Sequence, residues 1–190
     1  MSSPLVTPCP PIRLGTPAAA IEAYIRGKDG NRPHLLRAAF TDDARLAMHV
    51  RTAGISFPPG AAGRHAIAEL LVRQFNQTWE NVYTVCIGDP PDPAARSFSC
   101  NWLVAMSAKA DLGARLGCGR YDWVFDVRTG LAQSLVITIE AMVASAERAD
   151  AIADRAAALD YPWCSPRQLE ADPPEAPALR SVLATLRARL

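Results

Sequence analysis

The chain has 190 residues, a formal net charge of +1 and 49% hydrophobic residues. This length is typical of one domain with an appendage, and the apolar content is sufficient for a sizeable core. Charge this close to zero, with scattered basic residues, argues against a nucleic-acid-binding protein. No stretch approaches the roughly eighteen uninterrupted apolar residues of a membrane span. We therefore expect no nucleic-acid partner and no membrane partner.

The five cysteines are odd in number, widely spaced and free of CxxC pairs, which argues against a disulfide framework or a zinc site. The three histidines are scattered, so we expect no metal, and no motif calls for a cofactor. The N-terminus "MSSPLVTPCPPIRLGTP" lacks the basic start and apolar core of a signal peptide. Reduced thiols without a signal peptide favour a cytoplasmic location.

Residues 1–16 are rich in proline and aperiodic, which predicts an extended N-terminal arm. The "TP" dipeptide that follows supplies a capping residue and a first-turn proline for a helix over residues 17–28. A second short helix is expected over residues 32–40. The alternating run "ARLAMHV" predicts a strand over residues 44–50, and the turn-rich segment beyond it leaves room for a short strand at 55–57.

The clearest helical periodicity spans residues 64–79, and after it the period changes to two. Strands are expected over residues 80–89, 96–110, 115–127 and 131–143. The last two flank "RTG" and predict a long hairpin. An Ala-rich helix, a Pro-rich link and an amphipathic helix with a leucine stripe follow. We therefore expect three parts: the arm at 1–16, an α+β domain at 17–143 and a helical C-terminal extension at 144–190.

The order of helix, helix, strand, helix and four antiparallel strands, together with "FTDDARL", "GRHAIAELLVRQF" and the closing hairpin, covers roughly residues 17–143. It resembles the nuclear-transport-factor-2-like superfamily, whose SnoaL-like branch includes polyketide cyclases and steroid isomerases. The resemblance implies an α+β fold, in which a curved antiparallel sheet wraps a long N-terminal helix and leaves an apolar pocket at the mouth of a cone. Members of the superfamily include enzymes, ligand binders and adaptors, so fold does not settle function.

The resemblance to the steroid-isomerase branch implies specific positions for chemistry. The carbonyl-polarising tyrosine of that branch matches Tyr24, sixteen residues before Phe40. The position of its aspartate base holds Met48, which cannot take a proton. The position of its second acid holds Tyr121, with Asp122 one step away. Two of the three functional positions have changed, so we expect that the protein does not use the steroid-isomerase mechanism. We still expect the pocket to be present.

Two residues are candidates for catalysis. Tyr24 either donates a hydrogen bond to a ligand carbonyl or is a core tyrosine bonded to the backbone. His49 follows Met48, and imidazole titrates near neutral pH, so it is the least unsuitable general base. Strict alternation from Ala44 turns Leu46 and Met48 inward and His49 to the opposite face, where it would be a structural residue.

The candidate ligand-binding residues share an aromatic or thioether side chain on the expected sheet, the first helix or the turn-rich segment. They are Tyr24, Met48, Phe57, Trp102, Tyr121 and Trp123. Such side chains form the wall of an apolar pocket, or alternatively a dimer interface. Arg120 and Asp122 are expected as a charge pair on the outer face of the sheet. Glu140 is either a buried acid or an outward residue paired across the sheet, and we favour the second.

The function expected from the sequence is binding of a small, mainly apolar molecule in the cone, by a protein that forms a homodimer. As an enzyme it would be a cofactor-free isomerase, cyclase or dehydratase that acts by proton transfer. The alternative is a non-catalytic scaffold or dimerisation module that uses the face of its sheet.

Overall fold

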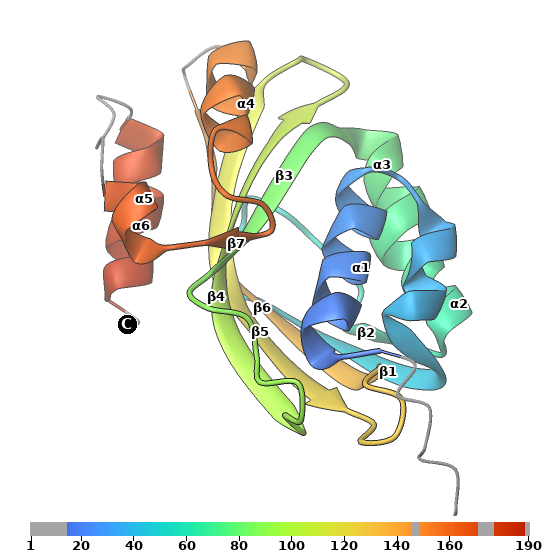
Figure 1. Cartoon of the computed structure of the whole chain (residues 1–190). Coiled ribbons are helices and arrows are strands. Elements are labelled where there is room, and N and C mark those ends of the chain that lie inside the picture. The colour runs from blue at the N-terminus through green and yellow to red at the C-terminus, as the bar shows by residue number, and fades with distance from the viewer. Residues whose placement is uncertain (1–14, 146–148, 171–176, 189–190) are drawn as a thin grey trace, which may run out of the picture.

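The structure is a computed structural model that describes residues 15–145, 149–170 and 177–188. The expected arm over residues 1–16 lies outside this part except for its last two residues. A seven-stranded curved sheet forms the centre of the molecule, one group of helices fills its concave face, and a second group covers its convex face (Figure 1). The predicted α+β class with a curved sheet around the first helix is confirmed.

The first helix, α1 (Pro17–Asp29), begins where the sequence predicts. The Thr16 side chain accepts a hydrogen bond from the backbone N–H of Ala19 at 3.2 Å, which caps the first turn. The helix ends at Gly30, and the expected second helix is the 3₁₀ helix η1 (Pro33–Ala38). Both pack against the concave face of the sheet.

Strand β1 (Phe40–Val50) alternates as predicted, because Leu46 and Met48 are buried and His49 is exposed. The prediction of a short strand at 55–57 is wrong, because these residues have no regular secondary structure. The neighbour of β1 is instead β2 (Gly60–Ala62). Its first residue comes so close to β1 that a Cβ atom there would lie 2.2 Å from the Leu46 carbonyl oxygen, so only glycine fits.

The helix expected over residues 64–79 is present as three consecutive segments. They are α2 (Arg64–Ala68), the π-helical η2 (Glu69–Gln74) and α3 (Phe75–Thr78). Ile67, Leu71 and Val72 from this helix are buried against the sheet.

The four expected strands after the helix are all present and antiparallel to one another. They are β3 (Trp79–Ile87), β4 (Ser97–Ala108), β5 (Ala114–Phe125) and β6 (Ala132–Ala144). The β5–β6 hairpin closes on Asp126, whose carboxylate accepts hydrogen bonds from the backbone N–H groups of Arg128 and Thr129. This is the turn chemistry that favours Asp before "RTG".

The complete strand order is β2-β1-β6-β5-β4-β3-β7, and two of the pairs are parallel. β1 runs parallel to β6, and the two-residue β7 (Trp163–Cys164) runs parallel to β3. The sheet is therefore mixed, whereas the resemblance implied a fully antiparallel sheet. Parallel pairs join segments that are far apart in the chain, so local alternation does not reveal them.

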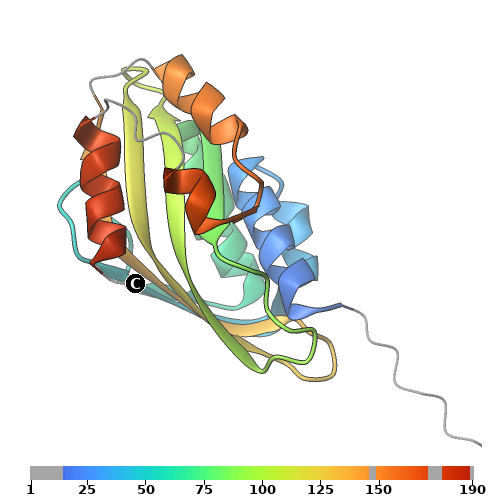
Figure 2. The same ribbon diagram turned by 60° about the vertical axis from the view of Figure 1, so that its left-hand side comes forward.

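The C-terminal extension covers the convex face of the sheet. α4 (Ala149–Ala157) and α6 (Pro177–Arg187) lie against the outer side of the strands, and α5 (Pro166–Glu170) lies between them in the chain (Figure 2). Val182, Leu183 and Leu186 from the predicted leucine stripe are buried against the sheet, while Leu190 lies outside the described residues.

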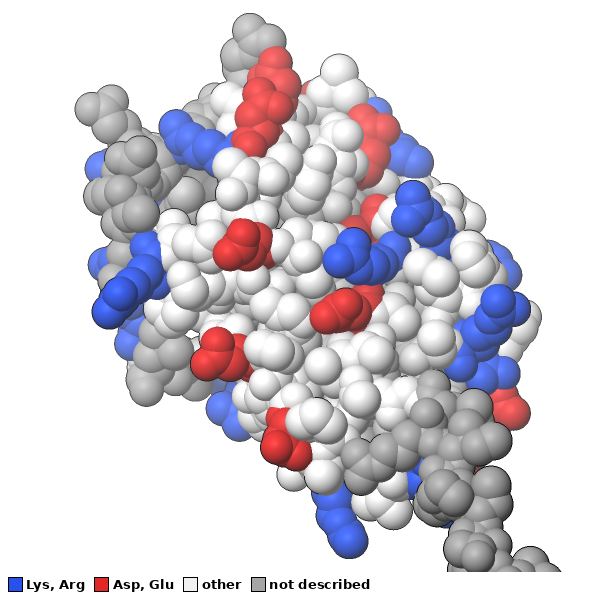
Figure 3. Space-filling model, in the orientation of Figure 1, with Lys and Arg blue, Asp and Glu red and all other residues white. Residues whose placement is uncertain are grey.

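The face seen in Figure 3 carries acidic and basic side chains interspersed among uncharged ones. This arrangement agrees with the near-zero net charge of the sequence. Within the described part of the chain, no helix combines the length and the apolar content needed to cross a membrane.

Candidate functional site

A small cavity lies inside the cone, between α1, the helix over residues 64–78 and the concave face of the sheet. Its volume is about 40 Å³. This is room for a few water molecules and is well below the roughly 300–1,000 Å³ of a drug-sized pocket. Its wall consists of Tyr24, Lys28, Met48, Ile55, Phe57, Leu71, Phe75, Thr84, Trp102, Val104, Met106, Tyr121, Ile137, Ile139 and Met142.

Three methionines contribute to this wall from three different strands. Met48 comes from β1, Met106 from β4 and Met142 from β6, and all three are buried. The chain has four methionines, and the fourth is Met1. Every methionine beyond the first residue therefore lines one cavity. A thioether side chain has three rotatable bonds, so this wall can change its shape more easily than a wall of branched residues.

The inner end of the cone is packed with aromatic rings. The ring centroid of Tyr24 lies 5.8 Å from that of Phe40, 5.9 Å from that of Tyr121 and 5.5 Å from that of Trp123. All three pairs are edge-to-face, a favourable arrangement for aromatic rings. Trp102 stacks on Tyr121 with a centroid distance of 5.5 Å. This aromatic end holds Tyr24 and Tyr121 rigidly at the cavity wall.

The hydroxyl groups of Tyr24 and Tyr121 interact with each other. Burial raises the pKa of both phenols well above their ordinary value, because a phenolate would be poorly solvated there. Both side chains are therefore neutral at physiological pH. They can donate or accept a hydrogen bond, but neither provides a ready base.

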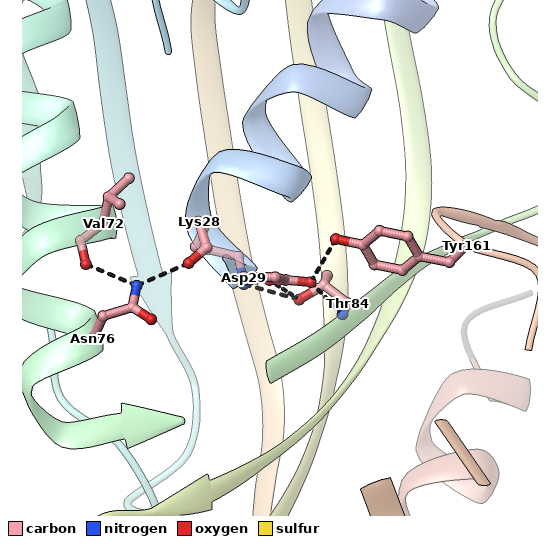
Figure 4. A network of polar contacts seen from close by, with 6 residues as sticks. All are labelled: Lys28, Asp29, Val72, Asn76, Thr84 and Tyr161. Atoms are coloured by element: carbon pink, nitrogen blue, oxygen red, sulfur yellow. Dashed lines mark hydrogen bonds and ion pairs between the residues drawn. The ribbon is translucent and has the colours of Figure 1, made fainter. Parts of the chain in front are cut away.

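One helical turn after Tyr24, a buried ion pair lies at the C-terminal end of α1. The Lys28 ammonium lies 2.5 Å from Asp29 Oδ1 and donates a 2.8 Å hydrogen bond to Thr84 Oγ1 (Figure 4). The two charged side chains are only 8% and 4% exposed. The ammonium also lies 5.0 Å above the centre of the Phe75 ring. Lys28 is thus the charged group in the cavity wall.

Asp29 is held by residues that are far apart in the sequence. Its Oδ2 accepts hydrogen bonds from the Thr84 backbone N–H at 2.7 Å and from the Tyr161 hydroxyl at 3.2 Å (Figure 4). Its Oδ1 accepts from the Thr84 hydroxyl at 3.0 Å. Burial raises the pKa of the Asp29 carboxyl, and the Lys28 ammonium opposes that rise. The C-terminal extension therefore contributes directly to this polar cluster through Tyr161.

Asn76 fixes the end of α1 from the other side. Its side-chain amide donates to the carbonyl oxygens of Lys28 and Val72, both at 2.8 Å (Figure 4). A buried amide that bridges two helices in this way orients the helix end from which Lys28 projects. Hydrogen bonds thus hold Lys28 at its backbone carbonyl as well as at its ammonium group.

Five of the six residues expected to bind a ligand line the cavity. They are Tyr24, Met48, Phe57, Trp102 and Tyr121. Phe57 lies in the segment between β1 and β2, which has no regular secondary structure, and it is partly exposed. Trp123 is not part of the wall. It is 1% exposed and packed among Tyr24, Phe40 and Phe125.

His49, the candidate base, is not brought to the cavity. Its side chain is exposed on the face of β1 opposite Met48, as strict alternation requires. A proton could not pass directly from a ligand in the cavity to this imidazole. The catalytic role considered for His49 is therefore without geometric support.

Sequence reasoning missed the cluster of Lys28, Asp29, Thr84 and Tyr161. A sign of it was present, because Lys28 lies four residues after Tyr24 and seven after Ile21, on the buried face of α1. A lysine at that spacing must either reach solvent or find a buried partner. The partner Tyr161, 132 residues from Asp29, could not be found from spacing.

The other polar candidates have structural roles. Arg120 Nε lies 2.8 Å from Asp122 Oδ1 on an exposed face, as predicted for a surface pair. Glu140 pairs with Arg51 at 3.0 Å, which agrees with the favoured pairing across the sheet, although the Glu140 side chain is only 12% exposed. The four cysteines of the described residues are buried free thiols. Among those residues, no group of three or more potential ligands could hold a metal ion.

Neither a protein-family model nor a curated protein sequence matches the chain. Solved structures do match. A candidate isomerase from Rhodopseudomonas palustris superposes with a TM-score of 0.53 at 14% identity, over 64% of this chain and 87% of that one. A candidate aromatic ring hydroxylase from Novosphingobium aromaticivorans gives 0.52 at 16% identity, over 72% and 95%. An NTF2-like protein from Burkholderia thailandensis gives 0.49 at 13% identity, over 65% and 90%.

The chain thus shares its fold with the Rhodopseudomonas and Novosphingobium structures, and its curved sheet around α1 agrees with the cone-shaped fold that the element order predicted. At these identities the likeness shows the fold alone. The activity of the similar proteins is not transferred with it, since one fold of this kind carries many functions.

Proposed function

We propose that the protein binds a small, mainly apolar molecule in the cavity of the cone. The observation that carries this proposal is the convergence of Met48, Met106 and Met142 on one space. Methionine also fills irregular gaps in ordinary cores, but these three, from three different strands, line a space that the core leaves open. Placed together, they form an apolar surface that can adapt to a guest.

The small volume of the cavity requires that the ligand displace side chains as it enters. Rotation of the methionines provides this space at little cost, because thioether rotamers differ little in energy. Ile55 and Phe57 form part of the wall from a segment without regular secondary structure, and both are partly exposed. Movement of this segment would provide an entrance without disturbing the sheet.

Binding is better supported than catalysis. An isomerase, cyclase or dehydratase that acts by proton transfer needs a base within reach of the ligand. Met48 cannot accept a proton, Tyr24 and Tyr121 are neutral, and His49 faces away. The Asp29 carboxylate is bound to Lys28 of the cavity wall, and its oxygens already accept four hydrogen bonds or ion-pair contacts.

The alternative of a scaffold that uses its sheet face has less support. α4 and α6 of the same chain cover the convex face, and their apolar side chains are buried there. A partner would have to dock elsewhere or displace them. Homodimer formation stays a prediction, and its interface would lie outside this covered area.

The proposal can be tested with α-methylstyrene, a small apolar probe, and two matched variants. Ile139→Phe fills the cavity from β6, and Ile152→Phe makes the same change in a buried isoleucine of α4 on the convex face. We expect the wild type and Ile152→Phe to quench or shift tryptophan fluorescence on titration with the probe, and Ile139→Phe to bind at least roughly tenfold more weakly. Equal binding by both variants, or no binding by the wild type, would contradict the proposal.

A further inference from the structure

Two hydrogen-bond donors in the cavity wall have N–H bonds without an acceptor among the described residues. An ammonium has three N–H bonds. Two of those on Lys28 have acceptors among the described residues, Asp29 Oδ1 and Thr84 Oγ1. The third has none there, and both Lys28 and the Phe75 ring beneath it line the cavity.

A second donor is present in the same wall. Trp102 is 4% exposed, and its indole Nε1 has no hydrogen-bond acceptor among the described residues. A buried donor without a partner costs about 1–3 kcal/mol, so an acceptor supplied from outside is favourable. The hydroxyl of Thr84 already accepts from Lys28 and donates to Asp29. One N–H bond of Lys28 and the indole N–H of Trp102 therefore have no acceptor among the described residues.

The charge of Lys28 is already balanced. Asp29 is fixed by Thr84 and Tyr161 on its remaining lone pairs, so it stays against the ammonium and does not turn away. A second anion in this apolar space would be repelled by Asp29 and would lose its hydration. A neutral oxygen acceptor has neither disadvantage.

We propose that the ligand is a neutral, mainly apolar molecule with a hydrogen-bond-accepting oxygen, such as a ketone, and that Lys28 donates the hydrogen bond that recognises this oxygen. This inference rests on the proposed function of the cavity and names the class of molecule it takes. It places the polar recognition at the end of α1, and not at the positions of Tyr24 and Met48 to which the steroid-isomerase resemblance points.

Acetophenone and α-methylstyrene form a matched pair of probes, because they differ only in a C=O that replaces a C=CH₂ group. Their affinities should be measured for the wild type and for the double variant Lys28→Met with Asp29→Asn. The double substitution removes both charges together, so neither is left buried without its partner. The ratio of the two affinities within each protein cancels effects that are common to both probes.

We expect the double variant to bind acetophenone roughly tenfold more weakly and α-methylstyrene with nearly unchanged affinity, which is the effect of losing one hydrogen bond to a charged donor. The control is Arg120→Met with Asp122→Asn, which removes an exposed ion pair by the same chemical changes. This control should bind both probes like the wild type. Near-ultraviolet circular dichroism verifies that each variant is folded.

Three outcomes would overturn the inference while the proposed function stands. The double variant could keep the wild-type ratio of affinities, the control could change that ratio equally, or benzoate could bind to the wild type more tightly than acetophenone. The last result would show an anionic ligand. Failure of both acetophenone and α-methylstyrene to bind would instead contradict the proposed function itself.

Discussion

The two faces of the sheet are both covered, but by side chains of different kinds. On the convex face, α4 and α6 pack Ile152, Val182 and Leu186 against small and aliphatic residues of the strands. On the concave face, the helices meet aromatic rings, three methionines and a buried ion pair.

This difference agrees with the proposed binding of a ligand on the concave face. Short branched side chains fill space with few rotamers, which suits a face whose task is to hold a helix in place. Methionines and a lysine around a residual cavity suit a face that must accept a guest. The C-terminal extension contacts both faces. α6 packs on the convex side, and the Tyr161 hydroxyl donates a hydrogen bond to the Asp29 carboxylate on the concave side.

The largest expected effect comes from removing the cover of the convex face. A chain that ends at residue 145 would expose Val85, Leu103 and Leu116 and would lose the Tyr161 hydrogen bond. We expect this chain to aggregate or to change its oligomeric state, as measured by size-exclusion chromatography with light scattering. A soluble truncated chain with the same number of subunits and the same melting temperature as the full chain would show that the cover is dispensable.

The ion pair on the concave face should be the most sensitive point of that side. Lys28→Met alone leaves Asp29 buried without its cation, and we expect a loss of about 3–5 kcal/mol in the free energy of unfolding. The double variant with Asp29→Asn should lose much less. Urea denaturation of both variants measures the difference. Equal losses in the two would mean that the charges do not interact in the folded protein.

Substitutions at two adjacent residues of β1 compare the buried side of the strand with its exposed side. Met48→Asp introduces an unpaired acid into the cavity wall and should cost roughly 1–3 kcal/mol or more. His49→Asp makes the same acid on the exposed side, and we expect a change within about 0.5 kcal/mol. Thermal unfolding of the two variants measures both effects. Similar destabilisation by both would indicate that the alternation of β1 is wrong.

Alkaline pH should lower the free energy of unfolding by a smaller amount than these substitutions. Burial raises the pKa of the Cys118 and Cys164 thiols to about 11, from an ordinary value of 9.0. Each thiol therefore keeps its proton longer in the folded chain than in the unfolded chain. Its contribution to stability is complete below about pH 9 and is lost as the pH rises through 11. Urea midpoints that fall between pH 9 and pH 10 would agree, and constant or rising midpoints would contradict this.

Much of the fold could be predicted from local pattern. Alternation placed Met48 inside and His49 outside on β1, and the change from helical to two-residue periodicity located the long strands. The parallel pairs of β1 with β6 and of β7 with β3 could not be predicted, because they join distant segments.

The candidate site was predicted unevenly for the same reason. Its aromatic and methionine wall followed from residue type and strand pattern. Lys28 was visible only as a lysine at helical spacing from Ile21 and Tyr24. The cluster around it depends on Thr84 and Tyr161, whose approach to Asp29 is a property of the complete fold.

The most direct test of the ligand-binding account uses the methionines themselves. A chain labelled with ¹³C at the methionine methyl groups gives one NMR signal for each methionine, and single Met→Leu variants assign the signals. On titration with acetophenone, we predict saturable shifts of Met48, Met106 and Met142 together, with one common dissociation constant. Signals that stay in place while the protein is folded and the probe is at millimolar concentration would contradict the account.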